Sequence, residues 1–445
     1  MVETEIKVQR YERYKDSGME WLGEVPEHWE INKMRNLGVF SASGIDKYIK
    51  KYESEVKIIN FTDIYANQKK TIDSSFNFMV VTTPELNRVK HLVKKGDLVL
   101  LPSSETYEDL GLSALIDEEL DNTSFSYHVI RFQFNIDMNH SFRKYLTNNE
   151  FVLNQFSRAG KGTTRKIIGR GVFKNIQVVI PPLSEQTAIA EFLDDKTTKI
   201  DEAITIKTQQ ISLLKERKQI LIHKAVTQGL NPNTKLKDSG VEWIGEVPEH
   251  WEVIANRILF TERKESGKIG LPLLSVSIHS GVSLEELNGD ENIRGKIKIE
   301  DKSNYKYVNV DDIVFNMMRA WQGAIGVVRV KGMVSPAYVV AQPNNKIVAS
   351  FFEYQYRTNS FIQQMNRSSK GITDFRKRLY WDEFKQLQTV LPPLKEQKEI
   401  SEFIETASQK IETTIRLKQQ EIAKLKEYKS SLINGVVTGK VKITL

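Results

Sequence analysis

The chain contains no cysteine, and this absence excludes several kinds of chemistry. Without cysteine, a protein of 445 residues has no disulfides, no thiolate nucleophile and no zinc site with cysteine ligands. Long apolar runs are missing too. No stretch approaches the roughly 20 apolar residues that a membrane-spanning helix needs, and the N-terminal region lacks the apolar core of a signal peptide. We therefore expect a soluble globular protein located in the cytoplasm.

Recognisable catalytic motifs are also missing. The sequence has no Gly-x-Gly-x-x-Gly, no Walker loop, no His-Glu-x-x-His and no carboxylate cluster with nuclease-like spacing. The Asp-Pro-Pro-Tyr type of motif found in amino-methyltransferases is absent, because the two Pro-Pro steps follow Ile180 and Leu391. His28 and His250 each precede a tryptophan, and no second histidine or carboxylate motif accompanies them at a recognisable spacing. We interpret both as structural, and we expect neither a catalytic site nor a metal site in this chain.

One segment of the sequence occurs twice. YKDSGMEWLGEVPEHWE at Tyr14–Glu30 returns as LKDSGVEWIGEVPEHWE at Leu236–Glu252, and identity this dense indicates an internal duplication. The Asp-Ser-Gly steps predict turns. The tryptophans of the motif are interpreted as large apolar anchors, and these are Trp21, Trp29, Trp243 and Trp251.

The two halves also match further along the chain. At one constant spacing, matching residues are Tyr127 and Tyr338, Tyr145 and Tyr356, Gly160 and Gly371, Arg165 and Arg376, Lys166 and Lys377, Phe173 and Phe384, and Gln177 and Gln388. Between the tryptophan motif and the first of these pairs, the halves differ in length and content. A shared frame with two different inner regions predicts two related sites that recognise two different things.

Short β-like runs dominate each half, and helical patches fall at Phe142–Phe156 and Phe351–Met365. Apolar residues make up 40% of the chain, which is enough to fill two cores. We expect each half to be an α+β domain with a curved or mixed sheet. The β-like runs are Val56–Phe61, Asp97–Leu101, Tyr127–Phe134 and Ile176–Ile180 in the first half, and Leu273–Ile278, Asp312–Phe315, Ala324–Val330 and Tyr338–Ala341 in the second.

Two stretches, Ser184–Thr227 and Lys395–Thr438, are predicted to form long helices. Their apolar residues recur at steps of seven, four or three among charged and polar residues, which is typical of a coiled-coil seam. Each helix follows a Pro-Pro-Leu-x-Glu-Gln segment, whose prolines end the preceding segment, and glycines follow both helix ends. The predicted seam consists of Leu193, Ile200, Ile204, Ile211, Leu214 and Leu221 in the first helix, and of Ile404, Ile411, Ile415, Ile422, Leu425 and Leu432 in the second.

The matching stripes make the two helices partners of each other. A helix of roughly 45 residues is ~65 Å long, and only a short linker follows the first helix. In a parallel pair the intervening domain would have to carry the chain back over that length. We therefore predict an antiparallel pair, with two domains related by a pseudo-twofold axis; the alternative is two unrelated surface helices. The expected parts are a first domain at 1–181, a first long helix at 182–228, a second domain at 229–392, and a second long helix with its tail at 393–445.

Each half contains a basic loop with a glycine, at equivalent positions. Lysine and arginine suit phosphates, while planar polar and aromatic side chains suit base edges. We predict DNA contacts from these loops and from residues that follow one strand of each half; the alternative is a solvated run of charge. The predicted contacts are Ser103, Ser104, Thr106, Tyr107, Lys161, Thr163, Thr164, Arg165, Lys166 and Arg170 in the first half, and Asn316, Arg319, Trp321, Gln322, Lys370, Thr373, Arg376, Lys377 and Arg378 in the second. A net charge of +7 is compatible with a polyanionic partner without identifying one.

Two motifs in combination closely resemble the specificity subunit of type I restriction-modification systems. They are the twice-written Pro-Pro-Leu-x-Glu-Gln before a long helix and the twice-written Lys-Asp-Ser-Gly-x-Glu-Trp-x-Gly-Glu-Val-Pro-Glu-His-Trp. The resemblance covers essentially the whole chain. It implies two target-recognition domains, each reading one half of a split site in double-stranded DNA. It also implies an antiparallel helix pair that sets the spacer between the half-sites and docks two methyltransferase subunits.

The resemblance further implies that the chemistry belongs to partner subunits. The methyltransferase subunits would bind S-adenosylmethionine and methylate adenine N6, and a separate motor and nuclease subunit would use ATP and magnesium. This chain would then carry no cofactor and no active site. Two other readings stay open at this point: a coiled-coil interaction scaffold that does not read DNA, and a DNA-modifying enzyme with an unrecognised active site.

Overall fold

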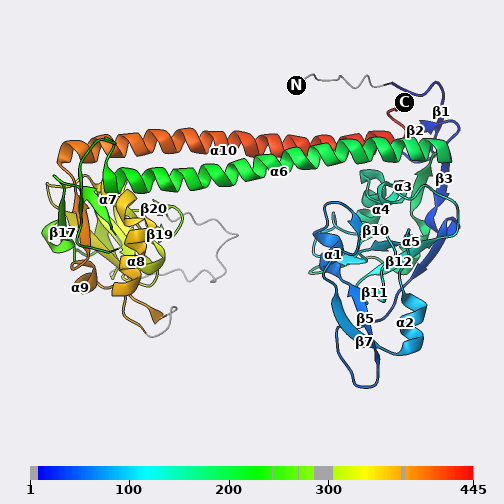
Figure 1. Cartoon of the computed structure of the whole chain (residues 1–445), viewed down its shortest axis with the longest axis horizontal. Helices are drawn as coiled ribbons and strands as arrows, with labels where there is room; N and C mark the ends of the chain where they lie inside the picture. Colours follow the sequence, from blue (N-terminus) through cyan, green and yellow to red (C-terminus); the bar gives the residue numbers. More distant parts are fainter. Residues whose placement is uncertain (1–8, 243, 269, 285–303, 372–375, 444–445) are drawn as a thin grey trace. The chain divides into compact units, whose positions relative to one another are not determined.

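The computed structural model contains two compact units (Figure 1). The first unit comprises Met1–Lys207 with Gln420–Leu445, and the second comprises Thr208–Gln419. Two long helices, α6 (Leu183–Gln228) and α10 (Leu394–Val437), each contribute one part to either unit. The compact units therefore cut across the four-part division expected from the sequence. The structure describes residues 9–242, 244–268, 270–284, 304–371 and 376–443.

The first unit is built around a mixed five-stranded sheet. Neighbouring strands are antiparallel except β6, which runs parallel to β10. A three-stranded sheet packs against the larger one through Ile59, Val99 and Phe125. The strand order is β4 (Gly38–Ser41), β12 (Ile130–Phe134), β8 (Leu98–Leu100), β10 (Ser113–Ile116), β6 (Thr71–Ile72) in the larger sheet and β11 (Thr123–Phe125), β5 (Ser54–Ile59), β7 (Met79–Thr83) in the smaller one. Smaller pairs are β1 (Tyr14–Asp16) with β2 (Glu24–Pro26), β3 (Glu30–Lys33) with β14 (Gln177–Ile180), and β9 (Ser103–Ser104) with β13 (Lys166–Ile167).

Short helices complete the first unit. Phe132, Phe142 and Phe156 are fully buried in one apolar cluster that also contains Leu193 of α6 and Val436 of α10. The long helices therefore contribute to the core of this unit. The short helices are the 3-10 turn η1 (Met34–Asn36) and the α-helices α1 (Phe61–Tyr65), α2 (Glu85–His91), α3 (Phe142–Thr147), α4 (Glu150–Ala159) and α5 (Arg170–Asn175).

The second unit is built around a four-stranded antiparallel sheet. Its core gathers Trp251, Phe315 and Phe352 with Ala225 of α6 and Ile404 of α10. The sheet order is β18 (Phe260–Glu262), β25 (Tyr338–Pro343), β22 (Ile313–Asn316), β23 (Ile325–Val327), and the smaller pairs are β15 (Leu236–Asp238) with β16 (Glu246–Pro248), β17 (Glu252–Ala255) with β26 (Gln388–Leu391), β19 (Leu274–Ser277) with β20 (Gly281–Leu284), and β21 (Lys306–Val308) with β24 (Gly332–Val334). Its short helices are η2 (Asn256–Ile258), η3 (Ala320–Gln322), α7 (Ala349–Tyr356), α8 (Asn359–Ser368) and α9 (Trp381–Phe384).

The expected local structure is confirmed. Each predicted β-like run contains a strand, and the α+β character of both halves is as predicted. Both helical patches are divided in two by a capping residue. The Asn149 side chain accepts a hydrogen bond from the Val152 N–H at the start of α4, and the Thr358 side chain accepts one from the Phe361 N–H at the start of α8.

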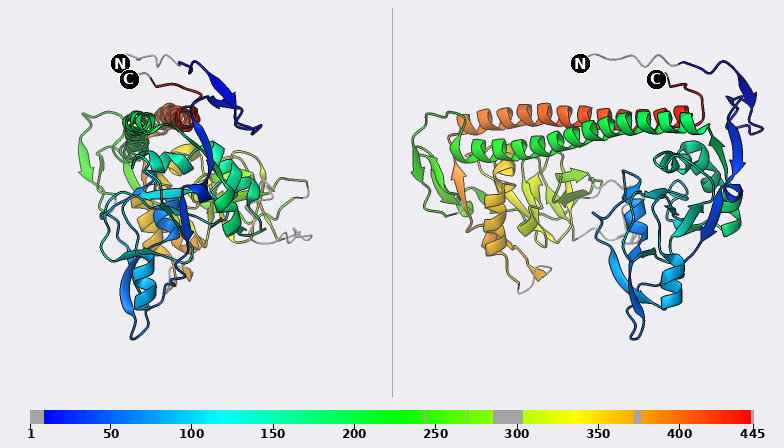
Figure 2. Two further views of the ribbon diagram at one scale, coloured as in Figure 1. Left: turned by 90° about the vertical axis from the view of Figure 1, so that its right-hand side faces the viewer. Right: turned by 45° about the vertical axis from the view of Figure 1, so that its right-hand side comes forward.

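The long helices pair antiparallel in each unit (Figure 2). Residues with higher numbers in α6 contact residues with lower numbers in α10. In the first unit Asp201 bonds Lys429 at 2.6 Å, and in the second Lys218 bonds Glu412 at 2.6 Å. All twelve residues of the expected seam are buried or half-buried, whereas Leu213, off the seam, is exposed. Within each unit, apolar burial and these ion pairs together define the helix register.

A glutamate in the first turn of each long helix binds the repeated motif. In the first unit, Glu185 accepts hydrogen bonds from the fully buried Trp29 indole N–H at 3.1 Å and bonds His28 Nε2 at 2.6 Å. The second unit repeats this arrangement with Glu396, which bonds Trp251 at 2.9 Å and His250 at 2.7 Å. Both histidines thus have a carboxylate partner, which their local sequence spacing did not indicate. The partner lies more than a hundred residues away, in the Pro-Pro-Leu-x-Glu-Gln segment.

The glutamine that follows each of these glutamates closes the turn before the helix. Gln186 donates to the Pro181 carbonyl at 2.9 Å, and its oxygen accepts from the Asn139 N–H at 3.0 Å. Gln397 donates to the Pro392 carbonyl at 2.8 Å, and its oxygen accepts from the Val348 N–H at 2.7 Å. In each Glu-Gln pair, the glutamate thus bonds the repeated motif, and the glutamine bonds the loop before α3 or α7.

Two features of the repeat differ from expectation. Trp21 is 51% exposed and is not a buried anchor, while Trp243 lies outside the described residues. The spacing between the halves is not constant either. The residue that corresponds to Tyr145 is Tyr354, not Tyr356, because Tyr145 donates to Asp194 of α6 and Tyr354 donates to Glu405 of α10.

The shift arises within the basic loops. Gly162 and Gly371 have the same left-handed backbone, and in both a side chain would meet the carbonyl of the arginine that follows, Arg165 or Arg376. Gly371 is therefore the counterpart of Gly162 and not of Gly160. The second loop is two residues longer, so the pairs before it are spaced differently from those after it. Part of this longer loop, at 372–375, lies outside the described residues.

We expect Glu185→Ala to destabilise the first unit. The substitution leaves the buried Trp29 N–H without an acceptor, and an unsatisfied buried donor costs ~1–3 kcal/mol. Chemical denaturation followed by tryptophan fluorescence measures the change. Glu191→Ala, at an exposed position of the same helix, is the control and is expected to leave stability unchanged.

The loss is expected to depend on pH. Burial alone would raise the pKa of Glu185, but hydrogen bonds from His28, Tyr11 and Trp29 outweigh it and hold the pKa below its ordinary value. A lowered carboxyl pKa stabilises the fold above the unfolded pKa, and this contribution fades as the pH falls through the folded pKa. The difference between wild type and Glu185→Ala should therefore shrink at acidic pH. A difference that grew on acidification would contradict this account.

Candidate functional site

In the first unit the predicted site residues come together from two separate segments. Strand β9 pairs with β13, so that Ser104 lies opposite Lys166. The Arg165 Nε donates to Ser103 Oγ at 3.0 Å, and the Ile168 N–H donates to the Pro102 carbonyl at 2.8 Å. The basic loop is thus fixed to the segment that follows strand β8.

An aromatic ring lies between the loop and this segment. The Tyr107 hydroxyl donates to the Gly162 carbonyl at 3.2 Å, and Lys166 Nζ lies 4.9 Å from the centre of the Tyr107 ring. Tyr107 remains 37% exposed. An ammonium group over an aromatic face is held by cation–π attraction, here at the surface of the molecule.

The second unit has the same arrangement with different residues. Lys377 Nζ lies 5.5 Å from the centre of the Trp321 ring and donates to the Asn366 side chain at 2.7 Å. The Leu379 N–H donates to the Met317 carbonyl at 2.9 Å, as Ile168 does to Pro102 in the first unit. Each unit therefore places the lysine at the corresponding position of its basic loop over an aromatic residue that follows a central strand.

The predicted contacts differ in how accessible they are. Ser103, Ser104 and Asn316 are buried and serve the fold; Asn316, for example, accepts from the Met318 N–H at 2.9 Å. Thr373 lies outside the described residues. The residues with exposed side chains are Thr106, Tyr107, Lys161, Thr163, Thr164, Arg165, Arg170, Arg319, Gln322, Lys370 and Arg376, while Lys166, Trp321, Lys377 and Arg378 are half-buried.

Gln322 takes part in a different feature of the second unit. It lines a hollow of about 710 Å³ together with residues of both long helices, among them Lys218 of α6 and Glu412 of α10. Carboxylates of Glu353 and Glu405 also line this hollow. Lys370, in contrast, is paired with Glu383 of α9 at 2.5 Å. Arg319 and Arg376 are exposed and lie within two residues of Trp321 and Lys377, respectively, in the sequence.

Sequence reasoning missed several aromatic and charged residues beside the first loop. The Arg165 guanidinium lies 5.7 Å from the Phe61 ring, which stacks on the exposed Tyr65 ring at 5.2 Å. Burial, with the nearby cations of Arg165 and Lys47, lowers the pKa of His128. The imidazole is therefore neutral at pH 7. Basic and aromatic groups alternate over this surface, as they do in nucleic-acid interfaces.

A local signal for part of this surface was present in the sequence. Lys47-Tyr48-Ile49-Lys50-Lys51-Tyr52 alternates lysine with large apolar residues, and every one of these side chains is exposed. Tyr52 is fully exposed and has a left-handed backbone, with φ of 69°. This conformation is uncommon for a residue other than glycine. The loop joins the rest of the surface through Ile45, whose carbonyl accepts from the Tyr127 N–H at 2.9 Å.

The described residues offer no site for a metal ion. Among them, no group of three or more histidine, aspartate or glutamate side chains is arranged to hold one. In the same part of the chain, no helix is long and apolar enough to cross a membrane. The two basic loops present cations and aromatic rings that are held by hydrogen bonds to neighbouring segments. Such groups are suited to binding a ligand and do not by themselves perform catalysis.

Comparison with known proteins gives consistent matches. The family described as "Type I restriction modification DNA specificity domain" matches twice, over residues 26–216 and 243–427. A putative type I restriction enzyme MjaX specificity subunit of Methanocaldococcus jannaschii is 23% identical over 435 residues, covering 95% of this chain and 96% of that protein. The type I restriction enzyme EcoBI specificity subunit of Escherichia coli is 28% identical over 258 residues, covering 54% of this chain and 53% of that protein.

Solved structures share the fold. One, from work on complex assembly and conformational transition of the type I R-M system, aligns with a TM-score of 0.68 at 13% identity, over 94% of this chain and 99% of that chain. The crystal structure of the HsdS subunit from Thermoanaerobacter tengcongensis aligns with a TM-score of 0.52 at 14% identity, over 96% of this chain and all of that one (100%).

Gly162 is the residue on which the geometry of the first basic loop depends. Its φ is +120°, and a side chain at this position would collide with the Arg165 carbonyl. We expect Gly162→Ala to displace the loop from β9 and to speed tryptic cleavage after Lys161, Arg165 or Lys166. Gly169→Ala is the control, because nothing lies within 4 Å of a side chain placed there. Equal cleavage rates in the two variants would refute this role for Gly162.

Proposed function

Because the chain belongs to the family of type I restriction-modification specificity subunits, we propose that each of its two domains reads one half of a split DNA site. Subunits of this family are the non-catalytic, sequence-reading members of their enzymes. The observation that supports the proposal is the repeated arrangement of a basic loop, a lysine and an aromatic ring in both units. A coiled-coil interaction scaffold that does not read DNA would not need this arrangement in both units.

Two kinds of residue are proposed to make two kinds of DNA contact. Arg165 and Arg376 occupy the same place in the two loops and are proposed to bind phosphates, which positions each domain without selecting a sequence. The residues that differ between the domains select the bases. In the first domain these are Tyr107 and Thr106, and in the second they are Arg319, Trp321 and Gln322. Arginine and glutamine can each form two hydrogen bonds to one base edge.

The long helices are proposed to set the spacer between the half-sites. The proposed functional parts are the recognition domains at 1–181 and 229–392 and the conserved helices at 182–228 and 393–445. Ile206 and Leu213 lie off the seam and are 54% and 63% exposed, and they are proposed to contribute to the docking of two methyltransferase subunits. These helix surfaces would place an enzyme near each half-site, because methylating a base within a duplex requires the base to be flipped out.

Cofactors belong to the partners in this proposal. S-adenosylmethionine is bound by the methyltransferase subunits, while ATP and magnesium are used by the restriction subunit. The chain itself contributes DNA contacts and docking surfaces. The assembly is proposed to work in the cytoplasm, where it meets chromosomal and incoming DNA.

The two classes of contact are expected to respond differently to substitution. Arg165→Ala should weaken DNA binding uniformly across sequences and lower the salt slope by about one unit, because one phosphate contact is lost. Arg319→Ala should change the preferred bases in one half-site only, with a discrimination loss of ~1–3 kcal/mol if the contact is bidentate. Gln322→Ala tests whether its hollow is open to DNA.

Binding titrations at several salt concentrations measure the first effect. A single-molecule methylome measures the second, in cells that carry the variant with its methyltransferase. Removing the gene should abolish adenine methylation at one split motif with a fixed spacer. Arg376→Ala is the matched control for Arg165→Ala in the other domain. Symmetric loss at both half-sites from Arg319→Ala would rule out one domain per half-site.

Shortening both helices together is expected to shorten the spacer. Removing one heptad at the same level of the pair, Thr208–Leu214 and Ile415–Glu421, keeps the seam in phase and shortens the pair by ~10 Å. At ~3.4 Å per base pair this corresponds to about three base pairs. The methylome should show a shorter spacer between unchanged half-site sequences. Altered half-site sequences would contradict a role of the helices as spacers.

A further inference from the structure

The first copy of the repeated motif exposes a tryptophan that the fold does not require. Met19, Leu22 and Val25 of the motif are buried, and Trp29 binds Glu185 from within the core. Trp21 is 51% exposed. A large exposed aromatic side chain among buried neighbours contributes little to folding stability, and such residues are often contact points for a partner.

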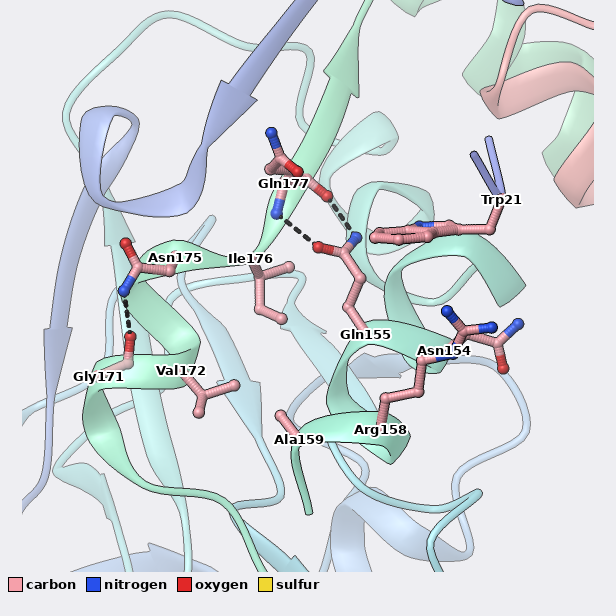
Figure 3. Close-up of a pocket in the computed structure, with 10 residues that line it drawn as sticks. All are labelled: Trp21, Asn154, Gln155, Arg158, Ala159, Gly171, Val172, Asn175, Ile176 and Gln177. Atoms are coloured by element: carbon pink, nitrogen blue, oxygen red, sulfur yellow. Dashed lines mark hydrogen bonds between the residues drawn. The ribbon is translucent and has the colours of Figure 1, made fainter. Parts of the chain in front are cut away.

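Trp21 and Arg158 together form a ridge between two hollows. The Arg158 guanidinium, on α4, lies 5.2 Å from the centre of the Trp21 ring (Figure 3). On one side is a hollow of about 470 Å³, whose lining includes Val172, Asn175 and Ile176 (Figure 3). The lining of this hollow combines apolar side chains, such as Val172 and Ile176, with side-chain amides, and the Trp21 indole lies at one edge.

The second hollow connects the ridge to the long helix. It has a volume of about 730 Å³ and is lined by Trp21, Arg158 and the last turns of α10, including Glu427 and Asn434. Asn434 is tied to the start of α4, because its side chain donates to Glu150 at 2.6 Å. The ridge is therefore continuous with the surface of the last turns of α10.

The charge around the ridge favours a protein over DNA. The second hollow carries charges of both signs, because Glu150 and Glu427 line it together with Arg158 and Lys440. The exposed Glu20 directly precedes Trp21 in the chain. Carboxylates repel phosphodiesters, whereas the basic loops described above attract them. A protein partner with its own apolar and charged side chains suits this surface better than a nucleic acid backbone does.

The internal duplication indicates which protein partner this is. The motif is identical in both copies at all but three of its seventeen positions, and Arg158 has a counterpart in Arg367, as Gln155 has in Gln364. The parts proposed to read DNA differ between the domains. Residues kept in both copies fit a partner that is the same for both halves. In the proposed function, that partner is the methyltransferase subunit.

We propose that the Trp21–Arg158 ridge docks one methyltransferase subunit, and that Arg367, the counterpart of Arg158, serves the other subunit. The partner inserts an apolar side chain into the hollow beside Trp21 and presents a carboxylate to Arg158. Tryptophan and arginine are the residue types that most often dominate the binding energy of an interface. This inference rests on the proposed function and adds the location of the contact.

The test is the stoichiometry of the complex formed by the full chain and its methyltransferase. Native mass spectrometry of the wild type is expected to show two methyltransferase subunits on one chain. Trp21→Ala should lose one of them, with at least a tenfold weaker affinity at that position, which is the size of a hot-spot effect. Arg158→Ala should weaken the same position, and Arg367→Ala the other.

Controls separate docking from folding and from DNA binding. Leu86→Ala removes a large exposed apolar side chain of the same unit, on α2, and is expected to leave two subunits bound. The melting temperature of Trp21→Ala and its DNA affinity as an isolated chain should equal those of the wild type. Two subunits bound to Trp21→Ala with unchanged affinity, or loss of DNA binding with docking intact, would overturn the inference. A wild-type chain that bound neither DNA nor methyltransferase would instead refute the proposed function.

Discussion

The hydrogen bond from a buried indole to a helix-initiating glutamate is the interaction on which each unit depends. Trp29 with Glu185, and Trp251 with Glu396, join the repeated motif to the first turn of a long helix. A buried indole N–H without an acceptor is costly, so the motif and the helix are held in one orientation. The strand that follows each motif, β3 or β17, then pairs with the strand that precedes each helix, β14 or β26. The recognition surfaces are built on this frame.

Much of this fold follows from patterns in the sequence, and the exceptions have physical reasons. The seam residues, the strands and the paired helices are visible because period and burial are linked in regular elements. The burial of Ser103 and Ser104 was not visible, because it arises from pairing with β13, which lies more than sixty residues further along the chain. The constant register also failed, because a two-residue insertion in one loop leaves the flanking helices and strands intact. Residues of the same type can then be matched at the wrong spacing, as Tyr145 was with Tyr356 in place of Tyr354.

The candidate site shows the same division. The basic loops and the lysine positions could be found from their equivalent placement, and the family to which the resemblance pointed is confirmed. The partners of those residues could not. Phe61 and His128 reach Arg165 only through the folding of distant segments, and Gln322 lines a hollow that residues of α6 and α10 complete. Contacts between segments far apart in sequence produce no repeating pattern in the sequence from which they could be predicted.

The division of each long helix between two units has a consequence for how the protein is made. The core of the first unit includes Leu432 and Val436, which the ribosome adds after the whole of the second unit. At ~5–20 residues per second, the intervening segment takes roughly 10–40 s to synthesise. During that time the apolar face of α6 near Leu193 and Ile200 lacks its partner. The domain that emerges first is thus completed last, and its unpaired seam is a surface for chaperones during translation.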